Sequence, residues 1–336
     1  MRRLFLFLLK LVLTLALLGA ALWGAGFIFF RAPAGLGGVG AIGFGLAGLA
    51  GAVGIWTAAL RLPLSFAVLF VGLLGWWNGL HPSHDRNWIP EIARLPAITR
   101  DGERITVSNV RNFRWRSETD PDIRWETRSY DLTQLTGLDL YLSYWAGESI
   151  AHMIVSFTFA DQPPLAASIE IRREQGEEYD ALAGFFRSYE LGYVLADERD
   201  IIGLRTHVRN EDVRLFRLRA TPAQARQVLE AYIADINLLN AQPRWYNTLT
   251  TNCTTMAYRL VRPLVPGWEL SAPIDPRVLM SGYLPGYLRD VGVVRQDIPL
   301  DQLIAASRIS ERARKLDRED PAFSAKIREG VPPGRP

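Results

Sequence analysis

"SIAHMIVSFTF", residues 149–159, predicts the centre of a β-sheet. The stretch is mostly apolar and rich in β-branched and aromatic residues, which is typical of an interior strand. The residues that follow, "DQPP" at 161–164, favour a turn. "LAASIEIRRE", at 165–174, then returns as a second strand. The sequence therefore predicts an antiparallel hairpin inside a larger sheet.

The chain on both sides of this hairpin alternates between predicted strands and predicted helices. Further strands are predicted at 104–115, 123–132, 137–145, 191–197 and 213–220. A short helix is expected at 177–189. A longer helix begins at Thr221, where Thr, Pro and Gln at positions 221, 222 and 224 form a capping box, and it runs to about Asn240.

These elements predict one α+β domain over residues 81–300. Residues 301–336 are expected to add a charged surface helix and a disordered tail, because the last residues read "VPPGRP". The cluster "ADERD", at 196–200, is expected to be a solvated turn or a salt-bridged loop.

Three apolar runs precede this domain, at about 11–30, 36–60 and 62–80. Each is long enough to cross a bilayer, so residues 1–80 are predicted to be a transmembrane anchor. The pattern GxGxxG occurs at 38–43, but no strand precedes it and no acidic residue follows at the required spacing. Gly43, Ala47 and Gly51 are instead expected to allow close packing of two helices.

Charge is distributed unevenly between the two parts of the chain. Residues 1–80 contain five Lys or Arg and no acidic residue, whereas the rest has 33 Lys and Arg against 35 Asp and Glu. The basic N-terminus predicts a multi-pass protein of the bacterial inner membrane, with its soluble domain in the periplasm. A cleaved signal peptide at the start is the alternative. The soluble part is not basic, so no nucleic-acid partner is expected.

Cys253, in "TLTTNCTTMAY" at 248–258, is the single cysteine of the chain, so an internal disulfide is excluded. A helix is expected to follow it, with Asn252 or Thr251 as the N-cap. A thiol in the first turn of a helix is stabilised as the thiolate, and the unpaired N–H groups there can bind an oxyanion. The alternative is a small buried core residue.

A thiol nucleophile needs a base, and His152 is the candidate because it lies within a predicted strand. The alternative is a core histidine. Glu170, on the partner strand with Ser168, is the candidate third catalytic residue. The strand register, which decides the face of the sheet on which Glu170 lies, cannot be predicted. His207 is expected to be a solvated loop residue.

Other polar and aromatic residues near the cysteine are candidates for substrate binding. They are Trp245, Tyr246, Asn247 and Asn252. The aromatic members fit core packing equally well. His81, His84 and Asp85 lack a further ligand cluster, so a linker is expected there, with no metal and no cofactor.

Several ordered motifs together resemble the Lnb N-terminal periplasmic domain family, which is lipoprotein intramolecular transacylase-like. They are "YLSYWAGESIAHMIVSF", "SIEIRRE", "GFFRSYEL", "ADERD" and "WYNTLTTNCTT", and the resemblance covers roughly residues 85–295. It implies thiol-dependent acyl transfer by Cys253 and His152. It also implies a permuted papain-like domain, similar to the NlpC-type and lecithin retinol acyltransferase-like groups, in which the histidine precedes the cysteine.

The predicted function is therefore that of a membrane-anchored acyltransferase or acyl hydrolase. Its expected partners are the bilayer and a membrane lipid or lipoprotein substrate. Two alternatives remain open. One is a cell-wall peptide amidase or peptidase that uses the same Cys–His pair, and the other is a membrane-tethered binding module without chemistry.

Overall fold

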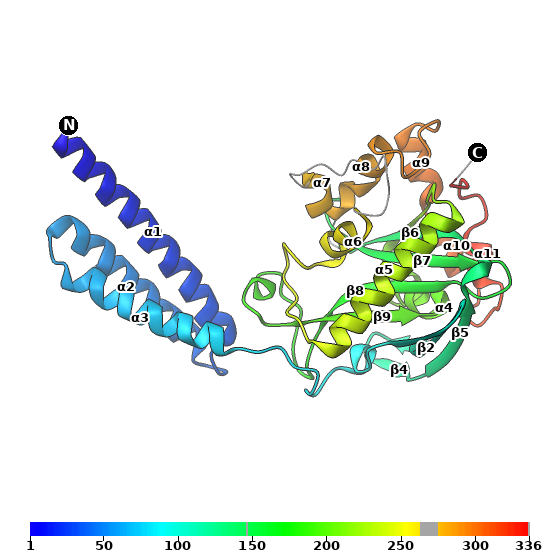
Figure 1. The fold of residues 1–336 in the computed structure, drawn as a ribbon, viewed down its shortest axis with the longest axis horizontal. Coiled ribbons are helices and arrows are strands. Elements are labelled where there is room, and N and C mark those ends of the chain that lie inside the picture. The colour runs from blue at the N-terminus through cyan, green and yellow to red at the C-terminus, as the bar shows by residue number, and fades with distance from the viewer. Residues whose placement is uncertain (146, 263–274, 335–336) are drawn as a thin grey trace. The chain divides into compact units, whose positions relative to one another are not determined.

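The computed structural model describes residues 1–145, 147–262 and 275–334, and it divides into two units (Figure 1). The helical unit comprises Met1–Ser83 and Tyr179–Tyr189. The sheet unit comprises His84–Glu178 and Glu190–Pro336. The chain thus combines long N-terminal helices with a mixed α/β domain, as the sequence predicts. The permuted papain-like topology stays a prediction.

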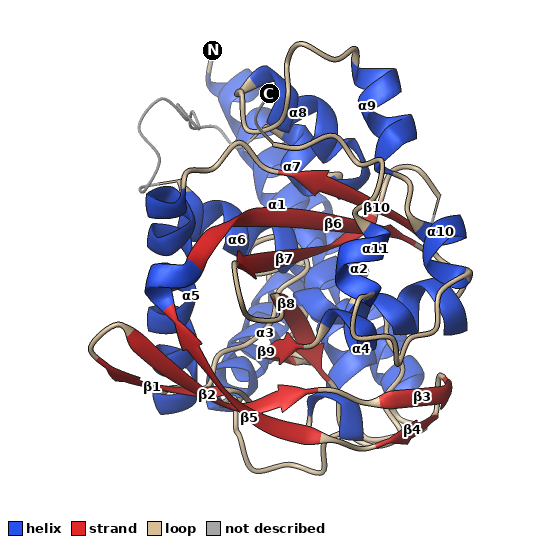
Figure 2. Cartoon of the chain, turned by 90° about the vertical axis from the view of Figure 1, so that its right-hand side faces the viewer, coloured by secondary structure: helices blue, strands red, loops and turns tan. Residues whose placement is uncertain are grey.

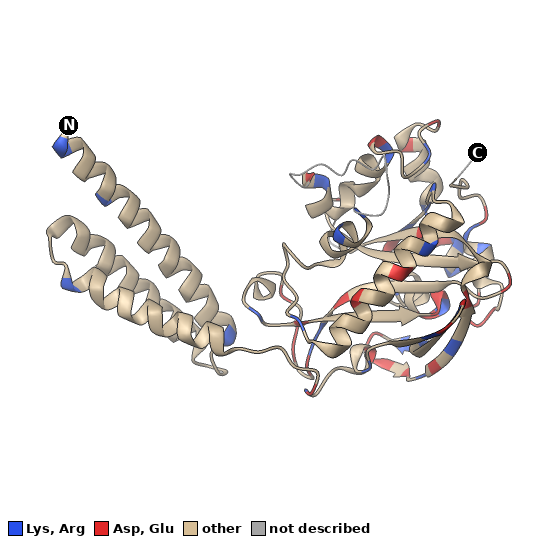
Figure 3. Ribbon diagram, in the orientation of Figure 1, with Lys and Arg blue, Asp and Glu red and all other residues tan. Residues whose placement is uncertain are grey.

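The helical unit contains three long helices, α1 (Arg2–Arg31), α2 (Gly37–Thr57) and α3 (Arg61–Gly79). Each is long and apolar enough to cross a membrane. None of the three contains an acidic residue, whereas both signs of charge occur throughout the sheet unit (Figure 3). Helix α2 ends three residues before the expected position, where Ala58 adopts a left-handed conformation (φ 60°).

Small residues let α1 and α2 pack closely. A Cβ on Gly48 would lie 2.3 Å from the Cβ of Ala21, so only glycine fits at this position. The expected stripe is therefore partly displaced. Gly51 does lie beside Leu17, but a Cβ on Gly43 would meet nothing within 4 Å.

The segment Tyr179–Tyr189 packs within the helical unit although it follows a strand of the sheet. Phe186 stacks on Phe30 with the ring centroids 5.5 Å apart. Arg187 Nη1 donates a hydrogen bond to the carbonyl oxygen of Trp77 at 2.6 Å, and its guanidinium lies 4.2 Å from the centroid of that indole. Only Ala183–Phe185 is helical here, as a single 3₁₀ turn, and the positive φ of Arg187 (56°) prevents this helix from continuing to Tyr189.

The sheet unit is built on an eight-stranded, mostly antiparallel sheet with the order β1-β2-β9-β8-β7-β6-β10, and β5 also pairs with β2. The strands are β1 (Ala97–Asp101), β2 (Arg104–Arg111), β5 (Trp125–Asp131), β6 (Leu135–Tyr144), β7 (Ala151–Phe159), β8 (Leu165–Arg172), β9 (Glu190–Ala196) and β10 (Asp212–Arg217). A small hairpin of β3 (Arg114–Ser117) and β4 (Asp120–Asp122) stands apart. The predicted hairpin is present as β7 and β8.

Helices cover both faces of the sheet (Figure 2). On one face lie α5 (Pro222–Ala241) and α6 (Cys253–Val261), and Tyr232 of α5 contacts Phe157 at a centroid distance of 5.8 Å. The predicted capping box of Thr221 and Gln224 begins α5. The other face carries α4 (Glu198–Gly203) and the π-helical turn Leu204–Val208.

The C-terminal segment differs from the expected surface helix and disordered tail. It forms α9 (Leu300–Ser307), α10 (Ser310–Arg314) and α11 (Phe323–Ile327). Ile309, Phe323 and Ile327 are fully buried in a core cluster that also includes Ile154 of the central strand β7. The apolar residues that separate the charges in this segment are therefore part of the core, and they fix it on the sheet.

Candidate active site

Cys253 is the first residue of α6, and Asn252 is its N-cap, as expected. The Asn252 side chain accepts hydrogen bonds from the backbone N–H groups of Thr254 and Thr255, and Thr255 Oγ1 accepts from the Asn252 N–H. This capping box begins the helix at the cysteine. The Cys253 side chain is partly exposed.

His152 and Glu170 lie side by side on β7 and β8. Their strands pair at Ile154 and Ser168, and each residue lies two positions beyond this pair, so both side chains point to the same face. His152 Nε2 lies 3.1 Å from Glu170 Oε1 and 2.7 Å from Ser168 Oγ. Ser168 Oγ in turn donates to Glu170 at 2.6 Å. The register that the sequence left open therefore places the carboxylate beside the imidazole.

The His152 ring is also hydrogen-bonded to the Cys253 thiol, and the sulfur accepts a hydrogen bond from the backbone N–H of Met153. The structure thus brings together the three predicted catalytic residues, in the order thiol, imidazole and carboxylate. This is the arrangement in which a base activates a nucleophile and a third group orients the base.

The three groups shift one another's pKa values toward the charged forms. Burial alone lowers the pKa of His152, but the charge of Glu170 and the hydrogen bond with Cys253 outweigh burial and raise that pKa to about 9. Burial raises the pKa of the Cys253 thiol, but the hydrogen bond and charge of His152 dominate and lower it. Attraction to His152 likewise outweighs burial and lowers the pKa of Glu170. At neutral pH this geometry favours a thiolate beside an imidazolium.

The start of α6 offers fewer oxyanion donors than the sequence suggested. The N–H groups of Thr254 and Thr255 both donate to Asn252 Oδ1, at 3.0 and 2.8 Å. These two N–H groups are therefore already used by the cap, and they cannot bind an oxyanion while the cap is in place.

Arg205 is a part of the site that sequence reasoning missed. Its Nη2 lies 3.5 Å from Glu170 Oε1. Its Nη1 lies 3.3 Å from Oε2 of a second carboxylate, Glu211. Ser143 Oγ donates a hydrogen bond to the same Glu211 oxygen. Arg205 comes from the π-helical turn that follows α4. No local pattern in the sequence indicated that this turn, more than thirty residues after Glu170, would face the carboxylate.

The four predicted substrate-binding residues lie in the loop before α6. Asn252 is occupied as the cap, and its Nδ2 donates to the carbonyl oxygen of Thr248 at 2.7 Å. Asn247 Oδ1 accepts from the N–H groups of Leu249 and Thr250, which shapes the loop. Tyr246 is buried, and Trp245 forms a β-bridge with Glu190. These contacts hold the loop in place, and substrate binding by these residues stays a prediction.

The remaining histidines of the sheet unit have contacts of their own. His84 Nε2 donates to the carbonyl oxygen of Leu239 at 2.8 Å, and its Nδ1 accepts from Arg172 at 3.2 Å. His207 is not solvated as expected. Its Nε2 lies 3.2 Å from the Leu316 carbonyl oxygen, and burial lowers its pKa.

Replacing Glu170 by glutamine should lower the pKa of His152 from about 9 toward the ordinary value of about 6.5, because the charge that outweighs burial is removed. The measurement is an NMR titration of the His152 ring in the full chain. Glu174→Gln is the matched control, since Glu174 lies just beyond β8 and pairs with Arg86 at 3.0 Å. An unchanged His152 pKa in Glu170→Gln would contradict the role given to this carboxylate.

Comparison with known proteins agrees with the motifs of the sequence. Residues 122–282 match the family model described as the Lnb N-terminal periplasmic domain, and the matched range includes His152, Glu170 and Cys253. The resemblance inferred from the motifs is thereby confirmed. No curated protein and no solved structure matches the chain. Together with the three apolar helices, the match indicates a membrane protein with a periplasmic domain.

Proposed function

We propose that this chain is a membrane-anchored, thiol-dependent acyltransferase or acyl hydrolase, because residues 122–282 match the family model of the Lnb N-terminal periplasmic domain. Its substrates are lipid or lipoprotein acyl esters. The observation that supports this most directly is the hydrogen-bonded series of Cys253, His152 and Glu170.

In the first step the Cys253 thiolate attacks the carbonyl carbon of an acyl ester. The new carbon–sulfur bond gives a thioester, the ester carbon–oxygen bond breaks, and the alcohol leaves with the proton held by His152. In the second step an amine or water attacks the thioester. His152 takes the proton of that nucleophile, and the thiolate is released. Glu170 holds the imidazole in place and stabilises its charged form.

The membrane helices are consistent with this substrate class. The proposed topology starts in the cytoplasm, in keeping with Arg2, Arg3 and Lys10, and three crossings of the bacterial inner membrane would then put the sheet unit in the periplasm. An enzyme tethered in this way meets acyl esters where they are concentrated, at the membrane surface.

The test is to capture the acyl-enzyme. Full-length protein in lipid vesicles is incubated with a diacylated lipopeptide, and the peptide that contains Cys253 is analysed by mass spectrometry. We expect a mass increase of one acyl chain that neutral hydroxylamine removes, and no increase in Cys253→Ala. The same protein is also incubated with cell-wall fragments. Cleavage of those fragments without any acyl adduct would favour a peptidase, and no change in either substrate would contradict both enzymes.

A further inference from the structure

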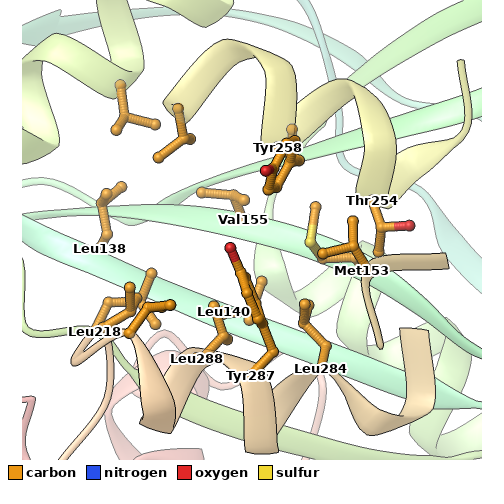
Figure 4. A pocket seen from close by; sticks show the side chains of 16 residues that line it. Leu138, Leu140, Met153, Val155, Leu218, Thr254, Tyr258, Leu284, Tyr287 and Leu288 are labelled. Atoms are coloured by element: carbon orange, nitrogen blue, oxygen red, sulfur yellow. The ribbon is translucent and has the colours of Figure 1, made fainter. Parts of the chain in front are cut away.

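A cavity of about 90 Å³ lies between the sheet and the helices that follow the candidate active site. Its floor is formed by β6 and β7, through Leu138, Leu140, Met153 and Val155. Side chains of α5, α6 and α8 (Leu284–Asp290) form its walls, among them Tyr287. Figure 4 shows that Met153 and Thr254 lie at one end of the cavity and Leu138 and Leu218 at the other.

The Met153 end of the cavity adjoins the nucleophile. Thr254 follows Cys253 in α6, and the backbone N–H of Met153 donates to the Cys253 sulfur while its side chain lines the cavity. Met153 pairs with Leu142 on β6, and Leu138 is four residues farther along that strand. The floor therefore extends roughly 13 Å along the strands, starting beside the thiol.

The polar groups of the lining are already engaged. The hydroxyl groups of Tyr258 and Tyr287 are hydrogen-bonded to each other, and Figure 4 shows them pointing toward one another. Thr254 Oγ1 donates to Asn252 Oδ1 at 2.9 Å. A polar ligand would have to break these bonds, whereas an aliphatic ligand would lie against apolar side chains such as Leu138, Leu140 and Met153.

We propose that this cavity binds an unbranched fatty acyl chain, with the carbons nearest the carbonyl at Met153 and the chain directed toward Leu138. The inference rests on the proposed function, because the chain is the one carried by the Cys253 thioester. A cavity of about 150 Å³ holds a benzene molecule, so a cavity of about 90 Å³ accommodates a short run of methylene groups. It therefore selects for straight chains next to the carbonyl.

The test compares p-nitrophenyl octanoate with p-nitrophenyl acetate, using the full-length protein in detergent micelles. Each buried methylene group strengthens binding roughly fourfold. Leu140→Trp fills the cavity and should lower the octanoate-to-acetate ratio of kcat/KM by about tenfold or more, whereas Leu140→Ala enlarges it and should raise the ratio. The control is Leu238→Trp, because Leu238 is an exposed leucine of α5, and it should leave the ratio unchanged.

The outcomes separate this inference from the proposed function. If folded Leu140→Trp and Leu140→Ala both keep the parent ratio, the cavity does not bind the chain, although Cys253 still forms the thioester. If no ester acylates Cys253, the proposed function fails, and the cavity is tested by binding alone. The probe is then cis-parinaric acid, whose fluorescence should rise with the parent protein and far less with Leu140→Trp. Equal binding to both proteins overturns the inference.

Discussion

His152→Ala is expected to lower the rate of acyl transfer by about 10²- to 10⁴-fold, which is the usual contribution of a positioned acid–base group. The substitution removes the base and also the positive charge that stabilises the Cys253 thiolate. The pKa of the thiol should therefore rise to its ordinary value of about 8.5 or above it, because burial, which raises this pKa, is then no longer outweighed by His152. At neutral pH a smaller fraction of Cys253 would then be thiolate, so alkylation slows as well.

Two measurements check this prediction on the same protein samples. One is the rate of acyl transfer, and the other is the rate of iodoacetamide alkylation of Cys253 as a function of pH. His81→Ala is the control, because His81 is an exposed residue outside the sheet unit, and both profiles should be unchanged. If His152→Ala has the same alkylation profile as the parent protein, the ion pair does not govern the reactivity of the thiol.

Arg328→Ala should destabilise the sheet unit by about 3–5 kcal/mol, the usual cost of removing one partner from a buried ion pair. Arg328, just after α11, donates to Glu198 at 2.7 Å and to Asp139 at 2.8 Å, and both carboxylates are almost completely buried. Alanine would remove the cation that both buried carboxylates share, while Asp139 would keep its 3.3 Å contact with Arg217. The C-terminal segment would also lose its ion pair with Asp139 of β6.

Thermal or denaturant unfolding of the full chain in detergent measures this effect. The matched control is Arg116→Ala, because Arg116 pairs with Asp120 and Asp122 at the exposed β3–β4 hairpin, where removing a pair changes stability little. Equal stability losses in the two variants would contradict the importance of the buried network.

The sequence predicts much of the site because its residues stand out locally. The single cysteine lies at a recognisable helix start, and His152 is a polar residue within an apolar strand, so the amino-acid pattern alone pairs a thiol with a base. Glu170 could only be a candidate, because strand register depends on the whole sheet. Arg205 could not be predicted, since only the tertiary fold brings its turn to the carboxylate.

Burial of charge was the least predictable feature. The "ADERD" cluster is salt-bridged but not solvated, because Asp200 is completely buried. The Asp200 carboxylate accepts hydrogen bonds from the Arg111 guanidinium, the Phe113 backbone N–H and the Trp115 indole N–H. The C-terminal segment has the pattern of a surface element, because its charges outnumber its apolar residues. Partners distant in sequence neutralise such charges, and a local pattern does not contain that information.

The segment Tyr179–Tyr189 means that neither unit is continuous in the amino-acid chain. The polypeptide passes between them after Ser83, after Glu178 and after Tyr189, so a single cut does not remove the whole helical unit. A fragment that begins at His84 still contains Phe186, but it has lost Phe30, the ring on which Phe186 stacks. A water-soluble version of the sheet unit therefore needs a second alteration, a shorter polar connection between β8 and β9.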